Sequence, residues 1–518
     1  MTSTAPSVPS VTAETAVTSI DARSGEPRGV VASVTSPEEL DAICHRAGAL
    51  VDPWRRTSRA DRAAALRSVA DALDAAVDEL VAVADAETAL GEVRLRGEVA
   101  RTTGQLRFFA TVITEGSYLE ATIDHADPTL AVPRPDLRLW LEPVGVAAVF
   151  GASNFPFAFS VLGGDTASAL AAGCPVVAKA HPSHPATCEA VLAHTRRGLA
   201  AAGVSTDLVQ LVHGLEAGAA LVAHPVIRAV GFTGSQGAGR ALARIAAERA
   251  VPVPFHGELG SVNPVVVTAA AAAERPEQIG RDLAAAVLLG SGQFCTKPGL
   301  CFVPEGPEGD AVVTAMGAAF DGTAGFTLLD AGIAGRYRSG VAALASHEAV
   351  AQVAAGAQQG RTVAATLLSL DAAALDHATT QECFGPTALV ARYGTDADLP
   401  ALLSRLEPSL TTTLQHATGE PVADLTDALS RQSGRVVFNG VPTGVAVTWA
   451  MTHGGPWPAT TSPYTSVGAS AIRRFLRPVT FQNAPADVLP QELRDAGVGR
   501  LTIPTRIDGT LVLPATAG

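Results

Sequence analysis

Lysine is scarce in this chain of 518 residues, and several common signals of function are missing from it. Only Lys179 and Lys297 are lysines among its 37 cationic side chains. The sequence has no uncharged apolar run of about 18 residues, so it predicts no membrane-spanning helix. It begins without a basic segment or a long apolar core, which argues against a secretory signal. Because 50 acidic residues give a formal charge of −13, binding to nucleic acid or an anionic membrane is not expected.

Cysteine is also sparse and has no spacing typical of a disulfide framework or a zinc site. The six cysteines are scattered, and no two form a Cys-x-x-Cys pair. We therefore expect reduced thiols and a cytoplasmic location. His181 and His184 lie in a proline-rich turn, which indicates turn or cofactor-edge residues, and no metal site is expected. A Walker loop and a Gly-x-Ser-x-Gly elbow are both absent, which weighs against P-loop enzymes and serine hydrolases.

Short apolar runs alternate with helical patterns over most of the chain, which has 47% hydrophobic residues and a mean hydropathy of +0.25. Apolar residues at three- and four-residue spacing predict helices from residue 52 to about residue 114. The strand and helix patterns that follow are typical of an α/β fold with a doubly wound parallel sheet. Ligands of such sheets bind beyond the carboxyl ends of the strands. Strands are expected at 145–150, 175–180, 208–214, 227–234, 263–269, 387–393 and 435–440.

Two other segments have different patterns. Residues 1–30 are rich in Ser, Thr, Ala, Pro and Val without periodicity, and we expect a flexible leader there. Residues 129–142 alternate between apolar and polar side chains in the manner of a strand or hairpin. A solvent-facing hairpin is more typical of subunit association than of catalysis.

Three residues have the chemistry of a covalent catalytic site. Cys295 lies in the turn SGQFCTKPG, where small neighbours would leave it accessible and Lys297 would favour the thiolate. Glu258, in FHGELGSVNP, is either a loop acid or a poorly solvated general base with a raised pKa. Asn154, in GASNFP, either caps a turn or donates a hydrogen bond to a developing oxyanion.

Two further features suit a phosphate or a ribose. The segment from Gly234 to Gly239 follows a predicted strand and opens a helix, so it is either a simple connection or a phosphate site. Lys179 ends a buried strand, where it is either solvated or a compact charge for a ribose hydroxyl or a phosphate.

Six motifs follow one another in a characteristic order. They are SNFPFAFS (153–160), AAGCPVVAKAHPSHP (171–185), GFTGS (231–235), HGELGSVNP (256–264), GQFCTKPG (292–299) and ECFGP (382–386). In content and order they resemble the aldehyde dehydrogenase superfamily over about residues 35–490. GASNFPFAFSVLGGDTASALAAGCP and MTHGGPWPAT (451–460) are most similar to one branch. It contains the 2,5-dioxopentanoate (α-ketoglutarate semialdehyde) dehydrogenases and NADP-preferring fatty aldehyde dehydrogenases.

The resemblance implies a role for each matching residue. Cys295 matches the nucleophile, Glu258 the general base and Asn154 the oxyanion donor. The implied cofactor is NAD or NADP. On the adenine side, Lys179 matches the residue at the ribose. Gly234 and Ser235 match the turn under the pyrophosphate, with Gly239 in the same segment. On the nicotinamide side, Glu382 matches the residue at the ribose and Phe384 the one beside the ring.

The chain departs from the family pattern at three positions. NAD-preferring members often carry a glutamate three residues after the strand lysine, where this chain has Pro182. Because Pro182 carries no carboxylate, nothing at this position repels the 2′-phosphate of NADP, and His181 could face that phosphate. NADP is therefore expected to be accepted and even preferred. Phe294 stands where the family often has arginine and could line an apolar substrate tunnel. Ser153 replaces the tryptophan common before the asparagine, which leaves that pocket wall undefined.

The implied fold has a Rossmann-like cofactor domain (31–124 and 144–257), an α/β catalytic domain (258–455) and a small β oligomerisation element (125–143 and 470–495). The implied reaction is oxidation of an aldehyde to a carboxylate through a thiohemiacetal and a thioester, with 2,5-dioxopentanoate as the expected substrate. The alternatives are a fatty or general aliphatic aldehyde dehydrogenase, a CoA-acylating relative and a non-enzymatic binding member. An anionic semialdehyde needs an arginine in the tunnel, and the sequence does not identify which. A homodimer or homotetramer is expected.

Overall fold

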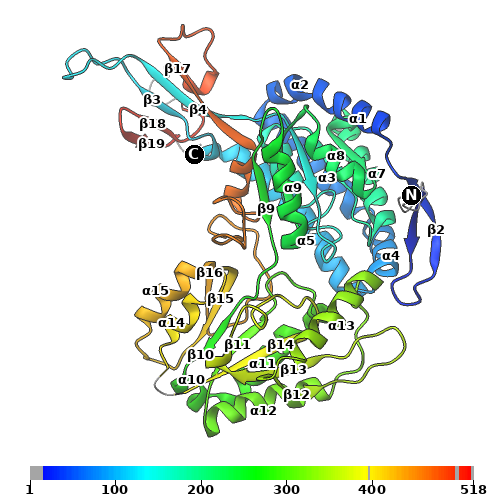
Figure 1. Cartoon of the computed structure of the whole chain (residues 1–518). Coiled ribbons are helices and arrows are strands. Elements are labelled where there is room, and N and C mark those ends of the chain that lie inside the picture. The colour runs from blue at the N-terminus through cyan, green and yellow to red at the C-terminus, as the bar shows by residue number, and fades with distance from the viewer. Residues whose placement is uncertain (1–15, 395–396, 496–500, 515–518) are drawn as a thin grey trace, which may run out of the picture.

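Four β-sheets organise the part of the chain that the computed structural model describes, namely residues 16–394, 397–495 and 501–514 (Figure 1). Two large sheets, each with its own helices, lie one above the other in Figure 1, and a smaller sheet projects from one side. The α/β class predicted from the sequence is confirmed. Within the described residues, no helix is long and apolar enough to cross a membrane.

The first large sheet is parallel throughout, with the strand order β7-β6-β5-β8-β9. Its strands are short apolar runs buried on both faces, as expected when helices cover a parallel sheet on both sides. They are β5 (Val146–Phe150), β6 (Val176–Lys179), β7 (Val209–Val212), β8 (Ile227–Thr233) and β9 (Phe255–Glu258).

The helices around this sheet begin at recognisable caps. Ser58 and Ser235, for example, accept hydrogen bonds from backbone N–H groups three residues ahead and so start α3 and α9. The helices are α1 (Pro37–Ala49), α2 (Val51–Arg56), α3 (Arg59–Asp74), α4 (Val77–Thr88), α5 (Glu92–Glu115), α6 (Gly164–Ala172), α7 (Pro185–Ala201), α8 (Leu215–Ala223) and α9 (Gln236–Glu248), with 3-10 turns η1 (Ser117–Leu119) and η2 (Thr206–Leu208).

The second large sheet has the order β12-β13-β14-β11-β10-β15-β16 and is parallel except for its edge strand β12. Its strands are β10 (Val265–Val267), β11 (Leu300–Pro304), β12 (Ala351–Ala355), β13 (Thr366–Asp371), β14 (Thr387–Tyr393), β15 (Ser409–Gln415) and β16 (Ser433–Phe438). Its helices are α10 (Ala269–Glu274), α11 (Pro276–Leu288), α12 (Pro307–Asp321), α13 (Ala331–Ala345), α14 (Leu399–Ser404) and α15 (Ala423–Gln432), with η3 (Leu289–Gly292) and η4 (Ala372–Ala374).

The projecting sheet has the order β17-β4-β3-β18-β19. The strand expected at 129–142 starts only at Leu137, because the preceding segment turns back on itself through a bridge between Asp127 and Arg134. The sheet also extends past residue 495, the limit set for it from the sequence. Its elements are β3 (Thr122–Asp124), β4 (Leu137–Pro143), η5 (Ala469–Phe475), β17 (Leu476–Gln482), η6 (Gln491–Leu493), β18 (Thr505–Ile507) and β19 (Thr510–Val512).

The prediction of a flexible leader over residues 1–30 is wrong for its second half. Strands β1 (Ala16–Ile20) and β2 (Pro27–Ser33) form an antiparallel hairpin beside α4 and α7 (Figure 1). The buried Ser19 hydroxyl donates to Glu87 Oε1 over 2.7 Å and so holds the hairpin against α4. The hairpin is thus held by a contact with a residue far away in the sequence, and the local sequence has no helical or strand periodicity that would predict it. Residues 1–15 lie outside the described residues.

Candidate active site

Cys295 lies in the turn between η3 and β11, at the junction of the two large sheets. The Asn263 side chain holds this turn, since its Nδ2 donates to the backbone oxygen atoms of Cys295 (2.8 Å) and Lys297 (3.1 Å). Asn263 itself has a positive φ of 53°, a conformation that asparagine tolerates better than most residues. The thiol of Cys295 stays partly accessible.

The expected activation of Cys295 by Lys297 is wrong. Lys297 Nζ is directed away from the thiol and donates to the backbone oxygen atoms of Cys383 (3.0 Å) and Thr387 (2.6 Å). Burial raises the pKa of Cys295 well above the ordinary value of a thiol, and the negative charges of Glu258 and Glu382 raise it further. The thiol is therefore protonated at neutral pH in this state.

Glu258 ends strand β9 and faces Cys295 through a shared histidine. His453 Nε2 lies 2.8 Å from Glu258 Oε1 and 3.4 Å from Cys295 Sγ. The Ser466 hydroxyl donates to the other oxygen of the Glu258 carboxylate. Burial raises the pKa of Glu258, but the attraction to His453 and the hydrogen bonds from His453 and Ser466 leave it below its usual value. The raised pKa expected from the sequence is therefore wrong, and the carboxylate is ionised at neutral pH.

Asn154 reaches the same site from the loop after β5. Its buried Nδ2 donates to Gln293 O over 2.9 Å, two residues before Cys295. The loop is fixed by α5, because Arg94 Nη2 donates to Asn154 O (2.7 Å). Glu98 Oε1 also accepts hydrogen bonds from two backbone N–H groups of the loop, at 2.8 and 3.0 Å. The structure thus brings together Cys295, Glu258 and Asn154, the three predicted catalytic residues.

The predicted phosphate and ribose residues lie at the carboxyl edge of the first large sheet. Lys179 ends β6, and Gly234 and Ser235 connect β8 to the N-terminus of α9. A Cβ at Gly239 would lie 2.3 Å from Leu259 Cδ2, so a larger residue there would displace the Leu259 side chain. An N-terminus of this kind presents backbone N–H donors suited to a phosphate.

His181 cannot supply the positive charge that a 2′-phosphate attracts. Its ring stacks on His184 at a centroid distance of 5.4 Å. Burial lowers the pKa of His181 well below its usual value, and the nearby cations His184, Lys179 and Arg336 lower it further. The imidazole is therefore neutral. Arg336, on α13, is a neighbouring cation that sequence reasoning missed.

Glu382 and Phe384 lie between β13 and β14, opposite the end of β9. A Cβ at Gly260 would lie 1.9 Å from Glu382 Oε2, so the carboxylate packs directly on that glycine. Burial raises the pKa of Glu382 to about 7, against the lowering effect of Lys297. Phe384 packs against the apolar cluster around α13. The two residues predicted for the nicotinamide side thus approach the Cys295 turn from the second large sheet.

Sequence reasoning missed several residues of this site. His453 lies within MTHGGPWPAT, which was noted only as a branch motif, and Asn263 lies within HGELGSVNP. Ser466 lies in no noted motif. None has a local signal of its role, because each role depends on contact with a residue far away in the sequence.

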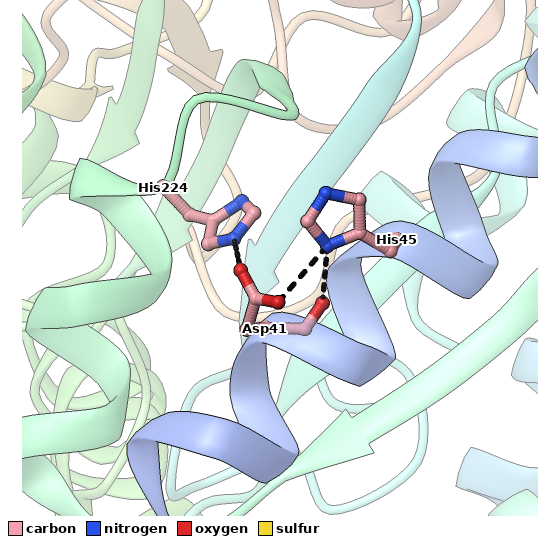
Figure 2. A group of neighbouring side chains, drawn as sticks. All are labelled: Asp41, His45 and His224. Carbon is pink, nitrogen blue, oxygen red and sulfur yellow. Dashed lines mark hydrogen bonds and ion pairs between the residues drawn. The ribbon is translucent and has the colours of Figure 1, made fainter.

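A second group of potential metal-ligating side chains lies away from this site. Figure 2 shows Asp41 and His45 on α1 and His224 at the end of α8. Asp41 Oδ1 lies 3.3 Å from His224 Nε2, and Asp41 Oδ2 lies 3.2 Å from His45 Nδ1. Two of the three side chains are exposed, and these contacts already link the two helices as a hydrogen-bonded cluster.

Comparison with known sequences agrees with the geometry. The profile of the aldehyde dehydrogenase family matches residues 9–461. The chain is 44% identical to alpha-ketoglutaric semialdehyde dehydrogenase 2 of Azospirillum brasilense over 94% of this chain and 95% of that protein. It is 39% identical to alpha-ketoglutaric semialdehyde dehydrogenase of Acinetobacter baylyi over 94% of each chain.

Solved structures show the same fold. Glyceraldehyde-3-phosphate dehydrogenase GapN of Methanocaldococcus jannaschii, complexed with NADP, superposes with a TM-score of 0.77 at 18% identity over 90% of this chain and 98% of that one. A bifunctional proline utilization A protein superposes with a TM-score of 0.75 at 26% identity over 87% of this chain, which spans 45% of that longer chain. The chain belongs to the aldehyde dehydrogenase family and is an oxidoreductase acting on aldehydes.

Proposed function

We propose that the protein oxidises 2,5-dioxopentanoate to 2-oxoglutarate with NADP as its preferred cofactor. The observation that carries this proposal is the site formed by Cys295, Glu258 and Asn154, in a chain that is similar over nearly its full length to two α-ketoglutaric semialdehyde dehydrogenases.

The first step is formation of a covalent bond between Cys295 and the aldehyde carbon. The thiol proton passes to the Glu258–His453 pair, and the thiolate adds to the carbonyl. Negative charge then develops on the carbonyl oxygen. Asn154 Nδ2, released from Gln293 O, donates to this oxyanion together with the Cys295 backbone N–H. The product of this step is a thiohemiacetal.

The family uses a nicotinamide cofactor, which takes up the hydride from the substrate carbon when it is bound. The residues of this chain fit such a group. A Cβ at Gly234, in the turn before α9, would lie 2.8 Å from Phe232 Cζ, and one at Gly239, within α9, would lie 2.3 Å from Leu259 Cδ2. The exposed N-terminus of α9 suits a phosphate. Lys179 and Glu382 offer a cation and a carboxylate for the two riboses.

The last step is hydrolysis of the resulting thioester. The proton that the Glu258–His453 pair took from the thiol is released to solvent before this step. Glu258, again ionised, then removes a proton from water, and the hydroxide adds to the thioester carbon. The carbon–sulfur bond breaks, the Cys295 thiolate leaves and the carboxylate product is released. A base beside the nucleophile favours water over CoA as the acyl acceptor, and this supports the hydrolytic reaction over the acylating one.

The preference for NADP rests on the surroundings of Lys179. Pro182 replaces a carboxylate that would repel a 2′-phosphate. Lys179 and Arg336, but not the neutral His181, supply positive charge near this position. We also propose that the projecting sheet β17-β4-β3-β18-β19 joins copies of the chain into a homodimer or homotetramer, because it extends away from both large sheets (Figure 1).

The test is a matrix of two cofactors and several aldehydes. The purified protein is mixed with NADP or NAD and with 2,5-dioxopentanoate or straight-chain aldehydes, and the absorbance of the reduced nicotinamide is followed, with Cys295→Ala as the control. We expect the highest kcat/KM with 2,5-dioxopentanoate and NADP. A kcat/KM that instead rises with aliphatic chain length would assign a fatty or general aldehyde dehydrogenase. Formation of an acyl-CoA would assign the acylating reaction.

A further inference from the structure

Two arginines converge on one loop beside the nucleophile. Arg101 lies on α5 and Arg435 on β16, far apart in the sequence. Arg101 Nη1 donates to the backbone oxygen of Val445, and Arg435 Nη1 donates to that of Gly444 over 2.8 Å. Arg435 Nη2 donates to Pro442 O as well. The loop 442–445 is therefore held from both sides by guanidinium groups.

Both guanidinium groups are close to the catalytic residues. Arg101 lies over the Phe159 ring at 5.6 Å, and that ring contacts the His453 ring at 6.2 Å. Arg435 lies near enough to Cys295 for a negative charge on that sulfur to raise the pKa of the guanidinium, against the larger lowering effect of burial. The positive charge of Arg101 also lowers the pKa of Cys295, against the larger effect of burial.

Arg101 and Arg435 are partly buried, and their acceptors among the described residues are backbone carbonyl groups alone. Buried Arg474, for comparison, pairs with Asp165 at 2.9 Å. Among the described residues, neither Arg101 nor Arg435 forms an ion pair, and the Nε–H of each is buried without an acceptor. Buried donors and charges without a partner are unfavourable. A carboxylate placed beside the two guanidinium groups would provide acceptors and a balancing charge for both.

A third arginine has a different position. Arg94 lies over the rings of Phe155 (5.1 Å) and Phe294 (4.7 Å) and donates to Asn154 O. Its Nη2 is thus occupied by the loop that carries the oxyanion donor, so Arg94 positions that loop. Guanidinium groups thus lie over the aromatic rings beside the nucleophile, and a charged surface of this kind does not suit a purely aliphatic substrate.

We propose that Arg101 and Arg435 form the subsite that binds the carboxylate of an ω-oxo acid, at the end opposite its aldehyde carbon. This inference rests on the proposed function and deepens it by naming the residues that select an anionic substrate. The carboxylate accepts hydrogen bonds from guanidinium N–H groups that are otherwise unpaired, and it balances two partly buried positive charges. A neutral aldehyde of the same length provides neither.

The test compares charged and neutral substrates in matched variants. Arg101→Met and Arg435→Met remove the charge and keep an apolar stem. Arg96→Met on α5 and Arg431→Met on α15 are the controls, because both arginines are exposed and pair with nearby carboxylates. Initial rates are measured with 2,5-dioxopentanoate, succinate semialdehyde and pentanal.

We expect kcat/KM for the two carboxylate-bearing aldehydes to fall about 10- to 100-fold in Arg101→Met and Arg435→Met, mainly through KM. The value for pentanal should change by less than about twofold, as should all values in the controls. Arg435→Lys should recover part of the loss, because the charge is restored without the fork geometry. Equal losses with charged and neutral aldehydes, or none with the charged ones, would overturn the proposal.

The test is completed by measuring how tightly a carboxylate-bearing inhibitor binds, which does not depend on oxidation of a charged substrate. 2-Oxoglutarate is added as a competitive inhibitor of pentanal oxidation, and its inhibition constant should rise at least about tenfold in both variants. If the wild type rejects 2,5-dioxopentanoate but takes succinate semialdehyde through these arginines, the proposed function fails and the subsite stands. If 2,5-dioxopentanoate is oxidised equally well by wild type and variants, the function stands and the subsite fails.

Discussion

His453 Nε2 lies 2.8 Å from Glu258 Oε1, and each of the two side chains has only 1% of its surface exposed. The same nitrogen lies 3.4 Å from Cys295 Sγ, so one imidazole contacts both the proposed nucleophile and the proposed base. Burial alone would raise the pKa of Glu258, and His453 is the largest influence that lowers it. We infer that His453 is a positioning residue that keeps the base ionised.

Replacing His453 by phenylalanine should move the pH dependence of thioester hydrolysis upward. The variant keeps a planar ring but removes the partner of Glu258, so the pKa of Glu258 rises and a higher pH is needed to ionise it. The measurement is the steady rate of p-nitrophenyl acetate hydrolysis against pH, since this ester acylates Cys295 without a cofactor. His453→Gln retains a hydrogen-bond donor and should shift the profile less. An unchanged profile in His453→Phe would contradict the positioning role.

Glu258→Gln should make Cys295 more reactive towards alkylating reagents at neutral pH. Glu258 is one of the negative charges that raise the pKa of the thiol, so its removal lowers that pKa and increases the thiolate fraction. In the wild type, alkylation by iodoacetamide should be slow at neutral pH and accelerate up to and beyond pH 9. In Glu258→Gln the acceleration should begin at lower pH. Labelling of Cys295 is located by mass spectrometry, with Cys295→Ala as the control, and a slower reaction in Glu258→Gln would refute this account.

The same variant should slow hydrolysis of the acyl-enzyme more than its formation. Without a carboxylate at position 258 the water loses its base, whereas His453 still contacts Cys295 Sγ and can take the thiol proton in the first step. Rapid mixing with NADP and aldehyde should then show a burst of reduced nicotinamide followed by a steady rate lower by about 10²- to 10⁴-fold. Loss of the burst together with the steady rate would show that His453 cannot take the thiol proton without Glu258, which would contradict this prediction.

The motifs indicated three residues that the structure brings together, because each motif places a reactive side chain at the end of a strand or in the loop or turn between elements. Cys295, Glu258 and Asn154 meet as expected from such positions. His453 was not predicted, since it reaches Glu258 across 195 residues of sequence. Arg101 and Arg435 were not predicted either, because nothing local distinguishes them from the many other arginines.

The errors have equally specific physical causes. Lys297 is close to Cys295 in the sequence, but its backbone N–H bonds to Phe294 O, and the turn directs its side chain to the carbonyl groups of Cys383 and Thr387. The hairpin in the first 33 residues depends on a hydrogen bond between Ser19 and Glu87, and a search for local periodicity does not detect such contacts.

Binding of the cofactor should strengthen as the pH rises through neutrality, because burial raises the pKa of Glu382 to about 7. Below this value the carboxyl group is protonated, and above it the carboxylate accepts hydrogen bonds from ribose hydroxyls more strongly. The dissociation constant of NADPH, measured by fluorescence in the wild type, should therefore decrease between about pH 6 and about pH 8.

In Glu382→Gln the group no longer titrates, so this pH dependence should disappear. The dissociation constant should also exceed that of the wild type at high pH by about 10-fold, the effect of losing one hydrogen bond to a charged group. Glu348→Gln, at an exposed position, is the matched control and should behave as the wild type does. A dissociation constant that falls with pH as steeply in Glu382→Gln as in the wild type would assign the titration to another group.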